Sequence, residues 1–400
     1  MTRESYRLFS EGKIRNLTIT NRLVRSATAE GGMTEEGRLI PGLLEFYERL
    51  TAGGAGMIIT GHMAVMPQGR AGHNQGCIWD DEYIEDIAQM ADQVHRTDES
   101  CRVIAQLSHC GRQKTAEDPT GDCTGPSAVP SPILERTARE LSNDEIEEVI
   151  ECFVQAMSRV KKAGFDGVQL HAAHGWLLSS FLSPYTNLRN DEFGGSLENR
   201  MRILAEIVTR GRALVGDFPI LVKINCDDFI LGGVDINLFQ QHVDELAKFG
   251  VDAVEISGGM WDCLARDEDT LGFFPIIIPE SRVRINKPEK QSYFLKYLKG
   301  IISSIPIILV GGNKNVENLE DIVKNEKVDF ISMSRPFISE PELPNRWKRD
   351  EGSEKADCTS CNMCILTVRE GLTNCMLKND KARHKENQKL FYEHWREFFK

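Results

Sequence analysis

Residues 163–173, AGFDGVQLHAA, form a short apolar run with internal glycines, which predicts a strand buried on both faces of a parallel sheet. The stretch that follows, HAAHGWLLSSFLSPYTNLRNDEFGGSLENRMR at 171–202, places His171 and His174 at the carboxyl end of this strand. Ligands bind at that edge in barrels and in open α/β sheets alike. We therefore predict that the two histidines belong to an active site.

Other short apolar runs, rich in Val and Ile, alternate with amphipathic segments along the chain. The eight predicted strands occupy residues 23–29, 55–65, 102–109, 166–173, 219–228, 251–259, 306–312 and 329–337. Residues 142–164 predict a helix with Ser142 or Asn143 as its cap and Glu145 reaching back to the first turn. Residues 235–250 predict a second helix, closed by Gly250. This alternation predicts the α/β class and a (β/α)8 TIM barrel.

The length of 400 residues, 41% of them apolar, suits one barrel with loop insertions. We expect the barrel to occupy residues 1–345, and a Cys-rich, helical C-terminal extension packed on it to occupy residues 346–400. The Pro-, Gly- and charge-rich stretches 110–141 and 260–290 follow the third and sixth strands, so both should roof the mouth that holds the histidines.

The last segment of the chain is aromatic on one side. A helix there would carry Phe391, Tyr392, Trp395, Phe398 and Phe399 on one stripe. We expect this stripe to dock on the barrel of the same chain; a contact between subunits of a homo-oligomer is the alternative.

Composition excludes two classes of partner. A net charge of -12 without a cluster of Lys and Arg argues against nucleic-acid binding. The N-terminal segment lacks an apolar signal core, and no run approaches the ~20 apolar residues of a membrane span. We expect a cytoplasmic protein that binds no membrane.

Four of the eleven cysteines are closely spaced. In a chain without an export signal, reduced thiols or metal ligands are expected rather than disulfides. The four form C-x2-C-x2-C-x10-C and are Cys358, Cys361, Cys364 and Cys375. This spacing is typical of iron-sulfur or zinc ligation. The H-x-x-H pair at 171–174 does not predict a hydrolytic zinc site, because no nearby carboxylate completes one.

The last two predicted strands end in small residues. VGG at 310–312 and MSR at 333–335 let backbone amides approach a ligand, and Arg335 supplies a positive charge. TIM barrels often bind phosphate at this pair of loops, so the sequence predicts a phosphate-bearing cofactor.

Motifs along the chain resemble the Old Yellow Enzyme family of FMN-dependent NADH:flavin oxidoreductases. They are Asn21 with Arg22, PQGR at 67–70, QLSHCGRQ at 106–113 and the HAAHGW stretch at 171–200. CTSCNMC at 358–364 further resembles the branch of trimethylamine dehydrogenase and 2,4-dienoyl-CoA reductase, whose barrels carry a [4Fe-4S] cluster. Those relatives continue into further nucleotide-binding domains, so we expect this chain to contain the barrel part only.

The resemblance implies a role for each matching residue. Ser26, Ala27 and Thr28 would lie along the isoalloxazine, with Ala29 where relatives tune the flavin potential. Gln106 would bond the pyrimidine edge, and Lys223 would stand near flavin N1 and the C2 carbonyl. Gly311, Gly312, Ser334 and Arg335 would hold the FMN phosphate. His171 and His174 would donate hydrogen bonds to a substrate carbonyl.

The implied reaction is reduction of a carbonyl-conjugated alkene by NAD(P)H through the flavin. Relatives protonate the product with a tyrosine at the position that Trp176 occupies here, and an indole N–H is not a usable acid. Three alternatives stay open: water or another side chain such as Tyr185 protonates, Trp176 walls an apolar pocket, or the reaction runs oxidatively.

Two further readings of the chain remain. It could oxidise an amine or another small substrate and pass electrons through the cysteine cluster to a separate electron-transfer protein. It could also be a non-catalytic flavin redox sensor. The sequence leaves open the substrate, the choice of NADH or NADPH, and whether the cysteines hold iron-sulfur, zinc or nothing.

Overall fold

The computed structural model describes residues 3–114, 123–265, 292–301, 303–326 and 328–394. Eight parallel strands form a closed barrel, because β12 pairs with β13 on one side and with β7 on the other. In chain order they are β3 (Leu23–Arg25), β4 (Met57–Ile59), β7 (Arg102–Ser108), β12 (Gly167–Ala172), β13 (Ile220–Asn225), β14 (Ala253–Ser257), β15 (Ile307–Leu309) and β16 (Phe330–Met333). Each lies within a predicted strand, and the TIM-barrel prediction is confirmed.

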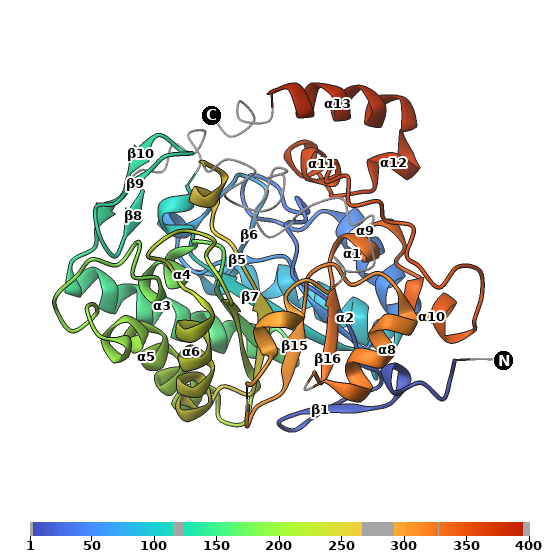
Figure 1. Cartoon of the computed structure of the whole chain (residues 1–400), viewed down its shortest axis with the longest axis horizontal. Helices are drawn as coiled ribbons and strands as arrows, with labels where there is room; N and C mark the ends of the chain where they lie inside the picture. The colour runs from blue at the N-terminus through green and yellow to red at the C-terminus, as the bar shows by residue number, and fades with distance from the viewer. Residues whose placement is uncertain (1–2, 115–122, 266–291, 302, 327, 395–400) are drawn as a thin grey trace.

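Helices surround the barrel (Figure 1). They include α1 (Pro41–Ala52), α2 (Ile84–Thr97), α3 (Asn143–Lys162), α4 (Leu177–Leu182), α5 (Leu197–Val215), α6 (Ile236–Phe249), α8 (Val316–Asn325), α9 (Arg335–Ser339) and α10 (Leu343–Lys348). The predicted capping box of α3 is present: Ser142 Oγ accepts from the amide of Glu145, and Glu145 Oε2 accepts from the amide of Ser142. Gly250 ends α6 at φ 84°, a conformation that glycine adopts without strain.

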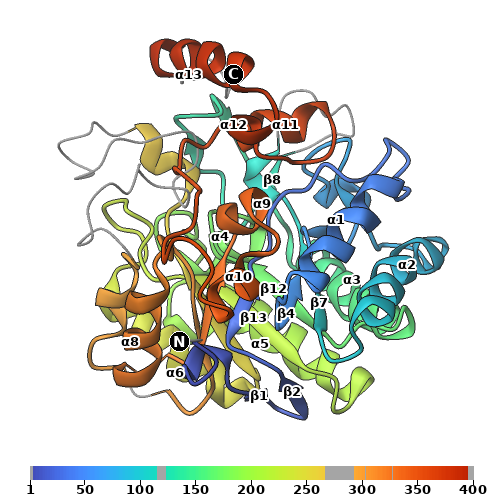
Figure 2. The ribbon, with the colours of Figure 1, turned by 90° about the vertical axis from the view of Figure 1, so that its right-hand side faces the viewer.

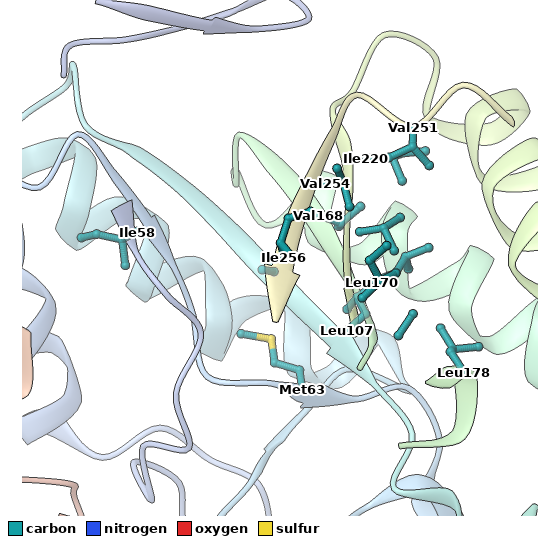
Figure 3. Close-up of a cluster of buried hydrophobic side chains, with 14 of the residues drawn as sticks. Ile58, Met63, Leu107, Val168, Leu170, Leu178, Ile220, Val251, Val254 and Ile256 are labelled. Carbon is teal, nitrogen blue, oxygen red and sulfur yellow. The ribbon is translucent and has the colours of Figure 1, made fainter. Parts of the chain in front are cut away.

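The core between strands and helices is apolar. Alternate residues of β12, β13 and β14 point outward onto the helices, among them Val168, Leu170, Ile220, Val254 and Ile256 (Figure 3). These strands are buried on both faces, so their sequences are nearly continuous apolar runs.

The barrel interior changes character along its axis. A separate apolar cluster fills it toward the amino ends of the strands and contains Ile14, Ile19, Val24, Met57, Ile59, Ile104, Leu221, Ala253, Ile308 and Phe330. Two members come from the hairpin of β1 (Gly12–Ile14) and β2 (Leu17–Ile19), which lies beneath the barrel in Figure 1. The sequence analysis did not predict this hairpin, because its strands are only three residues long.

The loop after the third barrel strand contains four two-residue strands: β8 (Thr124–Gly125), β9 (Pro130–Ser131), β10 (Arg136–Thr137) and β11 (Arg139–Glu140). In the loop after the sixth strand, a 3-10 helix spans Trp261–Ala265, and residues 266–291 lie outside the described residues. The prediction that this second loop roofs the mouth is therefore not examined by the structure.

The C-terminal extension lies over the carboxyl end of the barrel in both views (Figures 1 and 2). It contains α11 (Cys364–Glu370), α12 (Met376–Asn379) and α13 (Lys381–His394). The amide of Thr373 donates to the carbonyl of Glu30 at 2.7 Å, and Asn74 Nδ2 donates to the carbonyl of Val368. The boundary at residue 345 remains a prediction.

The predicted aromatic stripe, from Phe391 to Phe399, belongs to side chains outside the described ones. Of the helices that the structure describes, none has the length and apolarity needed to cross a membrane.

Candidate functional site

A cavity of about 370 Å³ opens at the carboxyl ends of the barrel strands. Every residue that the sequence assigns to flavin or substrate lines it: Ser26, Ala27, Thr28, Ala29, Gln106, His171, His174, Trp176, Lys223, Gly311, Gly312, Ser334 and Arg335. They come from six of the eight barrel strands and the loops that follow. The individual roles given to them remain predictions.

Polar side chains form the floor of this cavity. Register places Gln106 beside Gln169 across β7 and β12, and it places His171, Lys223 and Glu255 side by side across β12, β13 and β14. Because side chains alternate along a strand, these residues face the barrel interior directly above the apolar cluster. The interior thus turns polar where the strands end.

Glu255 is the centre of a buried hydrogen-bond network. Its carboxylate is fully buried and accepts from Ser26 Oγ at 2.7 Å, Ser332 Oγ at 2.7 Å and Gln169 Nε2 at 2.9 Å. Lys223 Nζ lies 3.5 Å from Oε2 of Glu255 and donates to Ser26 Oγ at 3.0 Å. The predicted cation at the flavin is therefore paired with a carboxylate. The sequence analysis missed Glu255.

Gln106 is oriented by the same network. Its Nε2 donates to Gln169 Oε1 at 2.7 Å, and Gln169 Nε2 donates onward to Glu255. The amide of Gln106 is thus fixed at the cavity floor by a residue of the neighbouring strand, and its side chain is ordered before a ligand binds.

The two predicted catalytic histidines are adjacent, with ring centroids 5.1 Å apart. His174 Nε2 lies 2.7 Å from Ser257 Oγ, and the backbone amide of His174 donates to Asn225 Oδ1 at 3.0 Å. His174 has φ 66°, a left-handed conformation that costs a non-glycine residue energy. Asn225 therefore holds the strained backbone that directs His174 into the cavity.

His171 has an unsatisfied polar atom. The side chain is buried, and its Nδ1 has no hydrogen-bond partner among the described residues. Burial lowers the pKa of His171 well below its usual value, and the neighbouring His174, His62 and Lys223 lower that pKa further. The ring is neutral at physiological pH. A buried polar atom without a partner is costly, so Nδ1 is suited to a ligand atom.

A third histidine, His62, lines the cavity beside this pair. Its ring centroid is 6.0 Å from that of His171 and 4.7 Å from that of Trp176. Burial lowers the pKa of His62 to about 4. The sequence analysis did not single out His62, although it follows β4 in TGHMAV at the same sheet edge as His171.

Tyr185, which the sequence offers as a replacement proton donor, is engaged elsewhere. Its hydroxyl donates to Asp262 Oδ2 at 3.3 Å, and it is absent from the described cavity wall. Asp262 is itself buried and paired with Arg112 at 2.6 Å. The structure therefore does not bring Tyr185 to the substrate-binding histidines.

The opposite end of the cavity is cationic. Arg335 and Lys314 both line it, beside Gly311 and Gly312. Arg335 Nη1 donates to Asn362 Oδ1, and Lys314 Nζ donates to the carbonyl of Cys358 at 2.6 Å. Lys314 was not predicted from the sequence. Both cations thus reach the cysteine segment as well as the cavity.

Gly311 is required by its surroundings. It has φ 104°, and a Cβ there would lie 2.7 Å from Tyr293 Cε2 and 2.6 Å from Phe294 Cδ2. Both the backbone conformation and the close aromatic contact exclude a side chain.

The four clustered cysteines lie beside the cationic end. Cys364 lines the cavity, whereas Cys358, Cys361 and Cys375 are absent from its described wall. Burial raises the pKa of the Cys364 thiol to about 12; Arg335 lowers that pKa, and the other three thiols raise it. Among the described residues, no three His, Cys, Asp or Glu side chains gather as ligands of one metal ion.

The residues at this cavity fit FMN. The cavity has a cationic end for a phosphate, a polar floor of amide and hydroxyl groups for a flavin ring, and a lysine at that floor. The unsatisfied Nδ1 of His171 lies on the substrate side. Each part of the expected cofactor therefore meets groups of matching chemistry.

Comparison with known proteins agrees with this geometry. The family model described as the NADH:flavin oxidoreductase / NADH oxidase family matches residues 7–354. An NADH oxidase of Thermoanaerobacter brockii is 35% identical over 362 residues, covering 90% of this chain and 53% of the relative. An NADPH dehydrogenase of Bacillus subtilis is 37% identical over 336 residues, covering 84% of this chain and 92% of the relative.

A solved structure of 2-naphthoyl-CoA reductase in complex with 2-naphthoyl-CoA superimposes with a TM-score of 0.81 at 25% identity, covering 93% of this chain and 56% of that one. The chain thus spans about half the length of that reductase and of the NADH oxidase.

Proposed function

Because the chain belongs to the NADH:flavin oxidoreductase / NADH oxidase family, we propose that it reduces the activated C=C bond of an α,β-unsaturated carbonyl compound with NAD(P)H. FMN, when bound, accepts hydride from the nicotinamide and supplies it to the β carbon of the alkene. The remaining work belongs to side chains of the cavity, which bind the flavin, orient the substrate and supply a proton.

Flavin binding is assigned to both ends of the cavity. Gly311, Gly312, Ser334 and Arg335 would hold the phosphate, and Lys314 adds a second cation there. Ser26, Ala27, Thr28 and Ala29 would lie along the ring, Gln106 would bond its pyrimidine edge, and Lys223 would stabilise negative charge at that edge.

The unsatisfied Nδ1 of His171, beside His174 and Lys223, is the observation that carries the proposed reaction. A neutral imidazole has one N–H, and a substrate carbonyl oxygen accepting from it would satisfy the buried donor. As hydride arrives, that oxygen gains negative charge, and the hydrogen bonds strengthen. The two imidazoles would therefore select carbonyl-conjugated alkenes.

The named relative that reduces a naphthoyl thioester supports an acyl-CoA or similar conjugated carbonyl as the substrate class. Trp176, stacked at 4.7 Å on His62 and 5.5 Å on His171, supplies an apolar aromatic wall suited to such a substrate.

We further propose that Cys358, Cys361, Cys364 and Cys375 hold a [4Fe-4S] cluster rather than zinc. Around one zinc ion, thiolate sulfurs would lie about 3.8 Å apart, since Zn–S bonds are about 2.3 Å. The four thiols influence one another's charge yet do not meet around one ion among the described residues, and a multi-iron cluster spaces its ligands more widely. Such a cluster would exchange electrons with a separate protein partner.

Anaerobic steady-state oxidation of NADPH and NADH with 2-cyclohexen-1-one or a 2-enoyl thioester tests the proposed reaction. Flavin-replete protein should turn over with at least one of these substrates, and His171→Ala should reduce kcat/KM about 100-fold or more. Absence of turnover would favour the redox sensor. Anaerobic bleaching of the oxidised flavin by an amine would favour the oxidative alternative.

A further inference from the structure

Reduction of a conjugated alkene also needs a proton at the α carbon, and the indole of Trp176 cannot supply it. We propose that His62 is the proton donor of this reaction, through its Nε2–H. This inference rests on the proposed function and assigns a catalytic residue that the sequence motifs leave out.

The position of His62 suits this role. Its ring is 4.7 Å from the Trp176 ring and 6.0 Å from the His171 ring, so it stands on the substrate side of the cavity. His171 and His174 would hold the carbonyl oxygen, and His62 approaches from the side of Trp176. The acid is thereby separated from the carbonyl-binding pair.

Hydrogen bonds fix which nitrogen of His62 carries the proton. Gln75 Oε1 accepts from the backbone amide of Ala71 at 2.6 Å, so the other atom of that amide, Nε2, is the donor. Gln75 Nε2 lies 2.8 Å from His62 Nδ1, and Ser108 Oγ lies 2.9 Å from it. Because an amide nitrogen only donates, Nδ1 is an acceptor, and the neutral ring carries its proton on Nε2.

The same donors help the ring to release that proton. Burial lowers the pKa of His62 to about 4, so the ring is neutral at pH 7 and acts as an imidazole rather than an imidazolium. Gln75 and Ser108 donate to Nδ1 and would stabilise negative charge left on the ring. A neutral imidazole is a weak acid, but the α carbon of an enolate is a much stronger base.

The step balances in atoms and electrons. Hydride adds to the β carbon, the alkene π pair shifts to the carbonyl oxygen, and the enolate forms against His171 and His174. The α carbon then takes the proton from Nε2 of His62, while the N–H electron pair stays on the imidazole. Water returns one proton to the ring, so each turnover consumes one hydride from NAD(P)H and one solvent proton.

Other acids of the described cavity wall are otherwise engaged. Glu30 is paired with Arg25 at 2.7 Å and accepts from Tyr47 at 2.8 Å. The cavity-lining tyrosine, Tyr293, lies beside Gly311 at the cationic end. His62 is therefore the titratable group best placed beside Trp176.

The test separates hydride transfer from protonation. Wild type and His62→Phe are reduced with NADPH and mixed anaerobically with 2-cyclohexen-1-one or with 1-nitrocyclohexene in a stopped-flow instrument. A nitroalkene accepts hydride to give a stable nitronate and needs no acid. We expect flavin reoxidation by the enone to slow about 100-fold or more in His62→Phe. Reoxidation by the nitroalkene should change less than about 3-fold, with nitronate released unprotonated.

Controls keep the outcomes distinct. Flavin content and the rate of reduction by NADPH report correct folding. His73→Phe, which replaces an exposed histidine outside the described cavity wall, should match wild type. In the double variant H62F/W176Y, a phenol at position 176 should restore reoxidation by the enone at least 10-fold over His62→Phe.

Three results would contradict the assignment. Reoxidation of His62→Phe by the enone at the wild-type rate excludes His62 as the donor. Equal slowing with both oxidants shows that His62 only positions substrate. Failure of wild type to react with either oxidant refutes the proposed function itself, and the wild-type measurement identifies that case before any variant is compared.

Discussion

Lys223 Nζ and Glu255 Oε2 lie 3.5 Å apart at the floor of the cavity, both buried. A lysine beside a flavin favours the reduced, negatively charged ring, and a carboxylate behind the lysine opposes that effect. The pair therefore sets the electrostatic environment in which the flavin is reduced.

Glu255→Gln should raise the two-electron midpoint potential of bound FMN by about 50 mV, because it removes a negative charge and leaves Lys223 uncompensated. Spectroelectrochemical titration measures this shift. Glu245→Gln, on the exposed side of α6 where Glu245 pairs with Lys248, is the control and should not move the potential. An unchanged potential in Glu255→Gln would show that Glu255 does not sense the flavin.

Gly311→Ala should weaken FMN binding and destabilise the fold by about 2–4 kcal/mol, since it combines a strained positive φ with a clash against Tyr293 and Phe294. Gly164→Ala is the matched control: Gly164 also has positive φ, 83°, but a Cβ there meets nothing within 4 Å. It should cost about 1 kcal/mol and retain flavin. Equal losses in the two variants, measured by urea unfolding, would remove the steric argument.

His242 predicts a pH effect on stability away from the cavity. The side chain is buried, its Nε2 has no partner among the described residues, and burial lowers its pKa to about 3. A histidine whose pKa is depressed in the folded state contributes stability above its unfolded pKa of about 6.5, and that stability is lost as pH falls toward 3. Wild-type Tm should therefore drop from pH 6.5 downward.

The variant His242→Leu should flatten this decline and raise Tm relative to wild type at pH 5, because a leucine has no proton to gain. His73→Leu, at an exposed position, should leave the decline unchanged. A pH dependence of Tm that is identical in wild type and His242→Leu would contradict the assignment.

Cys361→Ser should abolish iron and acid-labile sulfide without removing FMN, because Cys361 belongs to the cysteine cluster but not to the described cavity wall. Anaerobically purified wild type should contain about four iron and four sulfide per chain. Cys152→Ser, in α3, should resemble wild type. Stoichiometric zinc with no sulfide in wild type would reject the iron-sulfur proposal.

Pattern reasoning identified the fold because buried parallel strands produce apolar runs, and all eight barrel strands produced one. It also identified residues of one cavity, since the carboxyl ends of such strands converge. Ser142 and Gly250 were predictable because caps are local. The hairpin containing Ile14 and Ile19 was not, because its burial depends on contacts with strands distant in sequence.

The missed site residues show a second limit. Glu255 lies within a predicted strand, and its alternation with Ala253 and Ser257 would have placed it inside the barrel had the strand been examined by parity. His62 follows the end of β4, where periodicity no longer gives direction. Lys314 reaches the cysteine segment across 44 residues, a contact that local sequence does not encode.

The central claim is that FMN occupies the cavity opposite His171 and His174. The most direct measurement is the visible spectrum of purified protein, together with the dissociation constant for added FMN in wild type and Arg335→Ala. We predict flavin bands at one FMN per chain, with affinity weakened about 10-fold or more in the variant because Arg335 would hold the phosphate. A colourless protein that fails to bind added FMN would contradict the account.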